Sequence, residues 1–206
     1  MNRSKKIALI STRPHKTNVQ LSAELKNSEI RLLNYPLTKI YPLNNYQIFD
    51  ATIENLKTYQ HVIFISTNAV HFFLERQKKL SIRIPKNLIF ASIGPTTKLL
   101  LEKHLSVDVH CPVKTFDSKH LLKEKIFSNV KDQKILIVRG VDGRETLKND
   151  LEKKSAIVNY GECYLRKYVD VDLNKLKNDL TNYPHKFILF SSTNSAKHFL
   201  VQLRNI

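Results

Sequence analysis

"FISTNAVHFF" (64–73) occurs again, in altered form, as "FSSTNSAKHF" (190–199). In both stretches an apolar run ends in a turn of serine, threonine and asparagine, and aromatic residues then recur at helical spacing on one face. Two further pairs keep nearly the same separation: "IALISTRP" (7–14) with "ILIVRGVD" (135–142), and "LNYPLTKIY" (33–41) with "VNYGECYLRKY" (158–168). Three pairs in the same order indicate two related halves.

Each half predicts alternating strands and helices. The strand candidates are mostly continuous apolar runs, which is typical of parallel strands covered on both faces: 7–11, 30–35, 61–66, 88–93, 107–110, 135–139, 156–160 and 187–191. Helical patterns fall between them at 17–27, 68–79, 95–104, 116–128, 144–154, 173–180 and 194–204. Asn68, Thr96 and Asp117 are predicted to cap helices. The fold class is α/β, built from parallel sheets.

The repeat stops early. In the first half, "FASIGPTTKLL" (90–100) and "CPVKTFDSKHLL" (111–122) follow the shared turn and helix. Their counterparts would lie beyond position 206. We therefore expect the second half to lack roughly 40–50 residues that a full repeat would contain.

Composition excludes several classes of protein. With 42% hydrophobic residues among 206, the chain can bury a substantial core in one large domain or two smaller ones. No apolar run approaches the roughly 20 residues that cross a bilayer, so we expect no membrane partner. The N-terminal stretch has too few apolar residues for a signal peptide. Cys111 and Cys163 set neither a disulfide framework nor a zinc spacing, so we expect a reduced, cytoplasmic protein.

The net charge of +16 is spread along the chain without any run of five like charges. A nucleic-acid arm or a membrane patch would usually be a block, so neither partner is expected. A dispersed positive field suits a small polyanionic ligand, although a generally lysine-rich proteome explains the charge equally well. A nucleic-acid binder remains an alternative, against which the lack of aromatic residues clustered with lysines counts.

Polar loops follow the predicted strands, where helix N-termini present unpaired N–H groups to ligands. They are 12–14, 66–68, 93–97, 139–144 and 192–194. In "ILIVRGVDGRETL" (135–147), Arg139 and Arg144 flank a turn that begins at Gly140. A carboxylate-binding loop and a plain strand-to-helix turn both fit this stretch. Neither the Walker phosphate loop nor the dinucleotide fingerprint occurs in the chain, and no histidines and cysteines match a metal spacing.

An ordered set of motifs resembles the uroporphyrinogen-III synthase family over essentially the whole chain. The set is "TRP" (12–14), "FISTNAVHFF", "SIGPTTKLL" (92–100), "CPVKTFDSKHLL", "LIVRGVDGRETL" (136–147), "CYLRKY" (163–168) and "FSSTNSAKHFL" (190–200). Each motif alone is weak, but seven in order are fairly specific. The sequence departs from the family in one respect, because members usually continue beyond the second turn and helix.

The resemblance implies two related parallel-sheet α/β domains joined by a two-stranded linker, with the active site in the cleft between them. The first domain would comprise 1–36 and 169–206 and would be incomplete at its C-terminal end. The second would comprise 43–161, and the linker strands would be 37–42 and 162–168. We also expect a monomer.

The reaction implied by the resemblance closes linear hydroxymethylbilane into uroporphyrinogen III, with inversion of ring D and loss of water. It needs no metal and no organic cofactor. Tyr164, in the second linker strand, matches the family's tyrosine that acts as general acid on the departing hydroxyl. The substrate is rich in carboxylates, for which the expected binding residues are Arg13, Ser66, Thr67, Asn68, Gly94, Thr96, Arg139, Gly140, Arg144, Thr193 and Asn194. The alternative is a two-lobed binding protein for small polyanions, without catalysis.

Overall fold

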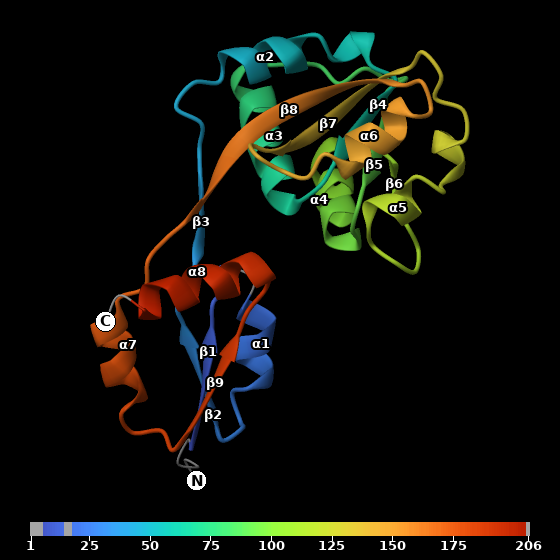
Figure 1. Ribbon diagram of the computed structural model, residues 1–206. Helices are drawn as coiled ribbons and strands as arrows, with labels where there is room; N and C mark the ends of the chain where they lie inside the picture. Colours follow the sequence, from blue (N-terminus) through green and yellow to red (C-terminus); the bar gives the residue numbers. More distant parts are fainter. Residues whose placement is uncertain (1–5, 15–17, 205–206) are drawn as a thin grey trace. The chain divides into compact units, whose positions relative to one another are not determined.

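The computed structural model describes residues 6–14 and 18–204. The chain divides into two compact units, of which unit 1 comprises Met1–Ile40 with Arg166–Ile206 and unit 2 comprises Tyr41–Leu165. The chain passes from one unit to the other twice, within strand β3 (Thr38–Tyr41) and near the end of the long strand β8 (Ile157–Tyr168) (Figure 1).

Unit 1 contains a three-stranded sheet in the order β2-β1-β9. Its strands are β1 (Ile7–Ser11), β2 (Ile30–Asn34) and β9 (His185–Leu189), and both outer strands run parallel to β1. Its helices are α1 (Val19–Glu24), α7 (Leu173–Leu180) and α8 (Thr193–Leu203). Ile10, Leu37, Leu176 and Phe199 form the centre of a small core.

One edge of this sheet carries exposed apolar side chains. Strand β9 pairs with β1 alone among the strands that the structure describes. Phe187 of β9 is 58% exposed and Ile188 is 40% exposed. Leu200, Val201 and Leu203 of helix α8 are also exposed. The apolar sequence of β9 predicted a buried strand, but β9 is exposed in the described part of the chain.

The second sheet has six strands in the order β3-β8-β7-β4-β5-β6. Strands β4 (His61–Phe64), β5 (Ile89–Ser92), β6 (Val109–His110), β7 (Lys134–Gly140) and β8 pair in parallel. The helices of unit 2 are α2 (Gln47–Glu54), α3 (Thr67–Lys79), α4 (Pro95–Leu105), α5 (Ser118–Leu121) and α6 (Thr146–Glu152). Two single 3₁₀ turns, η2 (Leu56–Thr58) and η3 (Lys125–Phe127), complete it.

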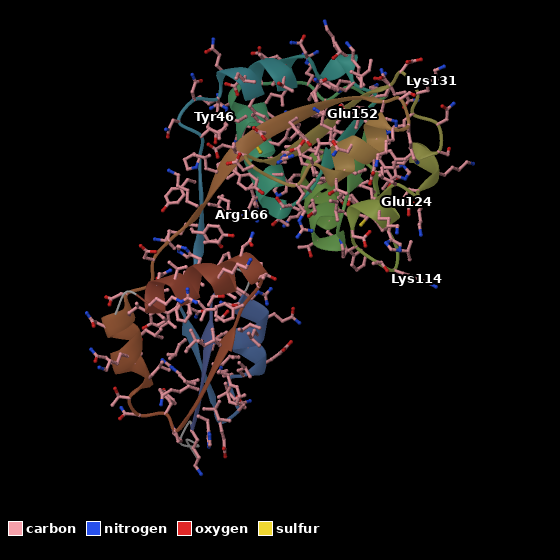
Figure 2. All side chains as sticks on the ribbon, viewed as in Figure 1. Tyr46, Lys114, Glu124, Lys131, Glu152 and Arg166 are labelled. Atoms are coloured by element: carbon pink, nitrogen blue, oxygen red, sulfur yellow. The ribbon has the colours of Figure 1, made fainter. Side chains whose placement is uncertain are left out.

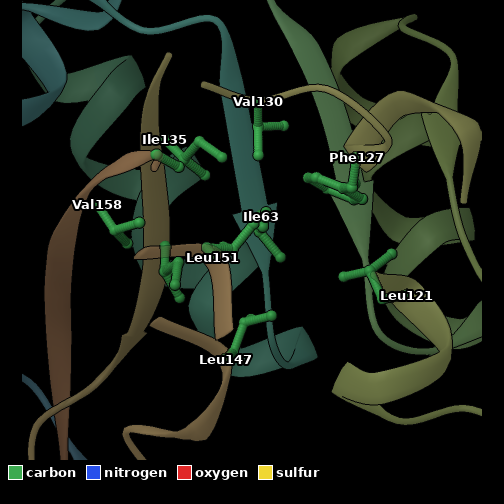
Figure 3. Packing of buried hydrophobic residues seen from close by; sticks show 11 residues of the cluster. Ile63, Leu121, Phe127, Val130, Ile135, Leu147, Leu151 and Val158 are labelled. Atoms are coloured by element: carbon green, nitrogen blue, oxygen red, sulfur yellow. The ribbon is translucent and has the colours of Figure 1, made fainter. Parts of the chain in front are cut away.

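The core of unit 2 explains the continuous apolar runs of its sequence. All four residues of β4 are buried, as are the last six of β7. On one side of the sheet, Ile63, Ile135 and Val158 pack against Leu147 and Leu151 of α6 (Figure 3). Each such side chain contributes about 1.5–3 kcal/mol by leaving water.

The α/β class with parallel sheets is confirmed, and each predicted strand has a counterpart. Helix α7 has the predicted bounds, 173–180. The predicted helix 116–128 is wrong as a single element, because extended backbone at Glu124 separates α5 from η3. Helix α2 was not predicted. The predicted strand 156–160 continues without interruption through the segment expected as a linker strand, up to Tyr168.

The helix caps give a mixed outcome. Asp117 caps α5 as predicted, since its carboxylate accepts a hydrogen bond from the N–H of His120. Asn68 lies inside α3, whose cap is Ser66, and Thr96 lies inside α4, whose cap position is Gly94. Both of those predictions are wrong by two residues. The error matters because the side chain that caps α3 is the Ser66 hydroxyl, which accepts a hydrogen bond from the N–H of Ala69.

Candidate functional site

The carboxyl ends of the strands in unit 2 bring three of the predicted loops to one edge of the sheet. Strand β4 is parallel to both β5 and β7, with Phe64 opposite Ser92 on one side and Val138 on the other. The loops that follow these strands are consequently neighbours, and α3 and α4 begin there. This edge carries Ser66, Thr67, Asn68, Gly94, Thr96, Gly140 and Arg144.

Tyr164 reaches this edge from β8. Its side chain is 1% exposed, and its hydroxyl oxygen lies 3.1 Å from the hydroxyl oxygen of Ser66. Its ring stacks on Phe72 of α3, with 5.7 Å between ring centroids and 22° between planes. The expected general acid is therefore a buried side chain whose hydroxyl is hydrogen-bonded to a partly exposed serine.

Gly140 makes room for the tyrosine ring. A Cβ at this position would lie 2.5 Å from Cε2 of Tyr164, closer than such atoms approach. The two residues are register partners in the β7–β8 pairing, just after an irregularity between Arg139 and Gly140. Gly140 therefore serves this site by lacking a side chain.

Arg139, an expected ligand-binding residue, is almost fully buried and held by contacts within the protein. The residue is 2% exposed, and its guanidinium is 3.1 Å from a carboxylate oxygen of Glu145 and 3.7 Å from one of Glu162. It also donates to the carbonyl oxygens of Gly140 and Arg144 and lies over the Tyr160 ring, 4.1 Å from its centroid. These contacts hold the loop together and leave the guanidinium little exposed surface for a ligand.

The electrostatics of this cluster follow from the same contacts. A hydrogen bond from the Tyr160 hydroxyl, at 2.7 Å, and then the Arg139 guanidinium lower the pKa of Glu145. Burial raises the pKa of Glu162, and the neighbouring Arg139 partly offsets that rise. Burial, followed by the bond to Glu145, raises the pKa of Tyr160. The charged and polar groups of this cluster therefore pair with one another.

Two candidate residues on this edge are exposed. Arg144 lies in the loop after β7, and Thr96 lies in the first turn of α4. A Cβ added at Gly94 would meet nothing within 4 Å, so packing does not require a glycine there. These positions leave a cation, a hydroxyl and a helix N-terminus available to an anion.

Unit 1 places its own candidates at the matching edge of its sheet. Arg13 follows β1 and is half-exposed, whereas Thr193 and Asn194 begin α8 and are exposed. Ser192 caps this helix by accepting a hydrogen bond from the N–H of Ser195. The repeated turn therefore builds the same local structure in both units.

Charged side chains project from much of the surface. In unit 2, Lys114, Lys131 and Glu152 are exposed on the outside, consistent with a charge that is spread rather than concentrated (Figure 2). Among residues 6–14 and 18–204, no three histidine, cysteine or acidic side chains gather as a metal ion would require. Over the same residues, no helix combines the length and the apolar character of a membrane span.

Sequence reasoning missed the partners of the site residues. Phe72, Tyr160, Glu145 and Glu162 were not predicted to take part. A partial signal was present in β8, where Tyr160 and Glu162 lie two residues apart and thus share one face of the strand. The pairing of Glu162 with Arg139, and of Tyr164 with Gly140 beyond the irregularity, could be assigned only from the strand register.

Two units with parallel sheets place the chain in the α/β class of proteins. Within that class, residues 19–206 match the family described as "Uroporphyrinogen-III synthase HemD". The chain belongs to the uroporphyrinogen-III synthase family.

Individual relatives agree with this assignment. The chain is 26% identical to a uroporphyrinogen-III synthase of Proteus mirabilis over 164 residues, covering 80% of this chain and 82% of that protein. It is 23% identical to the porphyrin biosynthesis protein HemD of Ruminiclostridium josui over 204 residues, covering 96% of this chain and 40% of that protein. The fold is similar to that of a mutant uroporphyrinogen III synthase from the extremely thermophilic bacterium Thermus thermophilus, with a TM-score of 0.65 at 12% identity, covering 95% of this chain and 76% of that one.

Proposed function

We propose that this chain is a uroporphyrinogen-III synthase, a lyase that cyclises hydroxymethylbilane with inversion of ring D and loss of water in haem biosynthesis. The observation that carries this proposal is the family match over residues 19–206. The expected departure of water needs a proton donor, and the edge of unit 2 holds a tyrosine and a serine in hydrogen-bond contact.

The protein has to orient the substrate more than it has to activate it. Pyrroles of the linear substrate are reactive enough to close without help into the uninverted isomer I. A protein that yields isomer III must hold the chain so that the inverted closure is faster, which is catalysis by orientation. The reaction is redox-neutral, so we propose that it proceeds here with side chains alone and without a metal or organic cofactor.

We propose Tyr164 as the source of the proton for the departing hydroxyl. For the carboxylates of the substrate, we propose Arg144, Thr96 and the α3 and α4 N-termini in unit 2, with Ser66, Thr67, Asn68 and Gly94 in those loops. In unit 1 we propose Arg13, Thr193 and Asn194. Exposure of Arg144, Thr96, Thr193 and Asn194 supports these assignments. The net charge of +16 favours such a ligand.

We further propose that the two units are related halves, joined by the linker strands 37–42 and 162–168. The order β2-β1-β9 in unit 1 corresponds to β8-β7-β4 in unit 2, and β5 and β6 have no counterpart among the described residues of unit 1. We also propose that the protein is a cytoplasmic monomer. We propose that it binds no nucleic acid, because its positive charge is not concentrated in one block of the sequence.

One observation favours a second candidate, a binding protein for small polyanions without catalysis. Tyr164 is almost fully buried, and a general acid has to come within hydrogen-bond reach of the group it protonates. The two candidates predict different products from the same experiment.

The test is incubation of the protein with freshly prepared hydroxymethylbilane, followed by oxidation and separation of the isomers. We expect predominantly isomer III, formed faster than the buffer alone forms isomer I. A binding protein would slow the loss of substrate or leave isomer I as the sole product, and that result would overturn the proposed activity.

A further inference from the structure

Tyr164 is buried, but its hydroxyl contacts that of Ser66, which is closer to the protein surface. With 1% of the residue exposed, the tyrosine hydroxyl cannot meet a substrate directly in this conformation. The partner of that hydroxyl is the Ser66 hydroxyl, 3.1 Å away, and either oxygen can be the donor. Ser66 is partly exposed and lies at the loop edge where ligands are expected.

The hydrogen-bond inventory of Ser66 leaves a proton available. A serine hydroxyl has one hydrogen and two acceptor positions. One position accepts the N–H of Ala69, at 3.2 Å, and the other can accept the hydrogen of Tyr164. In that arrangement the hydrogen of Ser66 is not used by Tyr164 or Ala69 and can point to a ligand.

The location of Ser66 also favours proton donation. It caps α3, a helix of 13 residues, and therefore sits at the positive end of the helix dipole. Negative charge that develops on the serine oxygen during donation is stabilised there.

Two neighbours hold the ring of Tyr164 in place. Gly140 allows the ring to approach the β7 backbone closely, and Phe72 stacks on the ring.

We propose that Ser66 is a catalytic residue that donates the proton to the departing hydroxyl. The buried Tyr164 hydroxyl then transfers its proton to the Ser66 oxygen. This inference rests on the proposed synthase function. As the carbon–oxygen bond of the hydroxymethyl group breaks, its electron pair stays on oxygen, which takes the proton of Ser66 and leaves as water. Ser66 takes a proton from Tyr164. The pyrrole-stabilised cation then undergoes ring closure, and the proton lost from carbon at that step restores Tyr164.

The repeated turn in unit 1 provides an internal comparison. Ser192 caps α8 as Ser66 caps α3, but its hydroxyl is paired with the Ser195 hydroxyl at 2.9 Å. A capping serine in this motif is therefore not always hydrogen-bonded to a tyrosine. The pairing with a buried tyrosine distinguishes the turn of unit 2.

The test compares single-turnover rates of isomer III formation in the wild type, Ser66→Asn, Ser66→Thr, Tyr164→Phe and the double variant Ser66→Asn/Tyr164→Phe. Asparagine caps a helix as well as serine does but has no hydroxyl proton, so helix α3 keeps its cap. We expect Ser66→Asn and Tyr164→Phe each to slow the reaction about 100-fold, with no further loss in the double variant, because both residues act in one relay. Ser66→Thr should stay within a few-fold of the wild type.

Other outcomes overturn the relay. If Ser66→Asn keeps the wild-type rate while Tyr164→Phe is slow, the tyrosine acts directly. If the two losses multiply in the double variant, the residues act independently. Asp172→Ala, which removes the cap of α7 in unit 1, controls for loss of a helix cap and should keep the rate. A wild-type protein that forms only isomer I would instead refute the synthase function itself.

Discussion

The strand before the repeated turn is buried in unit 2 and exposed in unit 1. Strand β4 has parallel neighbours on both sides, β5 and β7, and all four of its residues are buried. Strand β9 has only β1 beside it in the described part of the chain, and four of its five residues are exposed. The motif thus specifies the turn and the helix, whereas burial of the strand depends on what pairs with its other edge.

The polar contact at the end of the central strand also differs between the units. In unit 2, Arg139 of β7 faces Glu162 of β8 within a network of ion pairs. In unit 1, the corresponding pair on β1 and β2 is Ser11 and Asn34, which are bridged by Asn18 through hydrogen bonds of 2.9 and 2.6 Å. Neutral polar groups join the strands in one unit, and charged groups join them in the other.

The largest expected difference concerns burial of the two strands. Ile63→Ala should lower the free energy of unfolding by about 3 kcal/mol, because the isoleucine is fully buried in the centre of unit 2. Phe187→Ala on β9 should cost about 1 kcal/mol or less, since much of its ring is already in water. Urea unfolding followed by far-ultraviolet circular dichroism measures both. Equal losses would show that β9 is covered in solution.

The next expected effect concerns the polar contacts. Arg139→Ala should cost about 2–3 kcal/mol, because it removes a buried guanidinium that holds two carboxylates and two carbonyls. Ser11→Ala should cost about 1 kcal/mol, the value of one buried neutral hydrogen bond. Arg144→Ala should leave stability unchanged and raise KM. If Arg139→Ala folds normally and raises KM alone, the guanidinium is a ligand group after all.

The smallest expected effect is a pH dependence confined to unit 2. Burial lowers the pKa of His61 below its ordinary value of 6.5, and a hydrogen bond with Gln133 only partly opposes this. Below pH 6.5 the unfolded chain therefore binds the proton more readily than the folded one. Stability should fall as the pH drops from 6.5 toward the folded pKa and then level off. Hydrogen exchange of unit 2 amides measures this slope, and His61→Gln should flatten it; an unchanged slope would assign it to other groups.

Much of the fold could be predicted because its signals are local. Continuous apolar runs predicted the parallel strands, and the repeated turn predicted the helix that follows it in each place. Helix α2 was not predicted because its N-cap residue, Tyr46, makes no side-chain capping hydrogen bond, and the helix buries only Phe49 and Ile53. Burial of β9 was expected from its apolar residues, but that property depends on a neighbouring strand.

The positions of the candidate loops could be predicted from the sequence, whereas the contacts of their side chains could not. Loops at the carboxyl ends of parallel strands follow from topology, so their position could be predicted. The inward direction of Arg139 is set by Glu145, Glu162 and Tyr160, which belong to other segments. The Ser66–Tyr164 contact joins residues 98 positions apart, and a single sequence holds no signal for that pairing.

The most direct measurement is the fraction and rate of isomer III formed by the wild type, Ser66→Asn and Ser192→Asn from the same hydroxymethylbilane preparation. Both substitutions keep a helix cap, so they differ mainly in whether the lost hydroxyl was joined to a tyrosine. We predict isomer III at similar rates from the wild type and Ser192→Asn, and about 100-fold slower formation by Ser66→Asn. Equal rates from the two variants would contradict the special role of the unit 2 turn, and isomer I alone from the wild type would contradict the proposed activity.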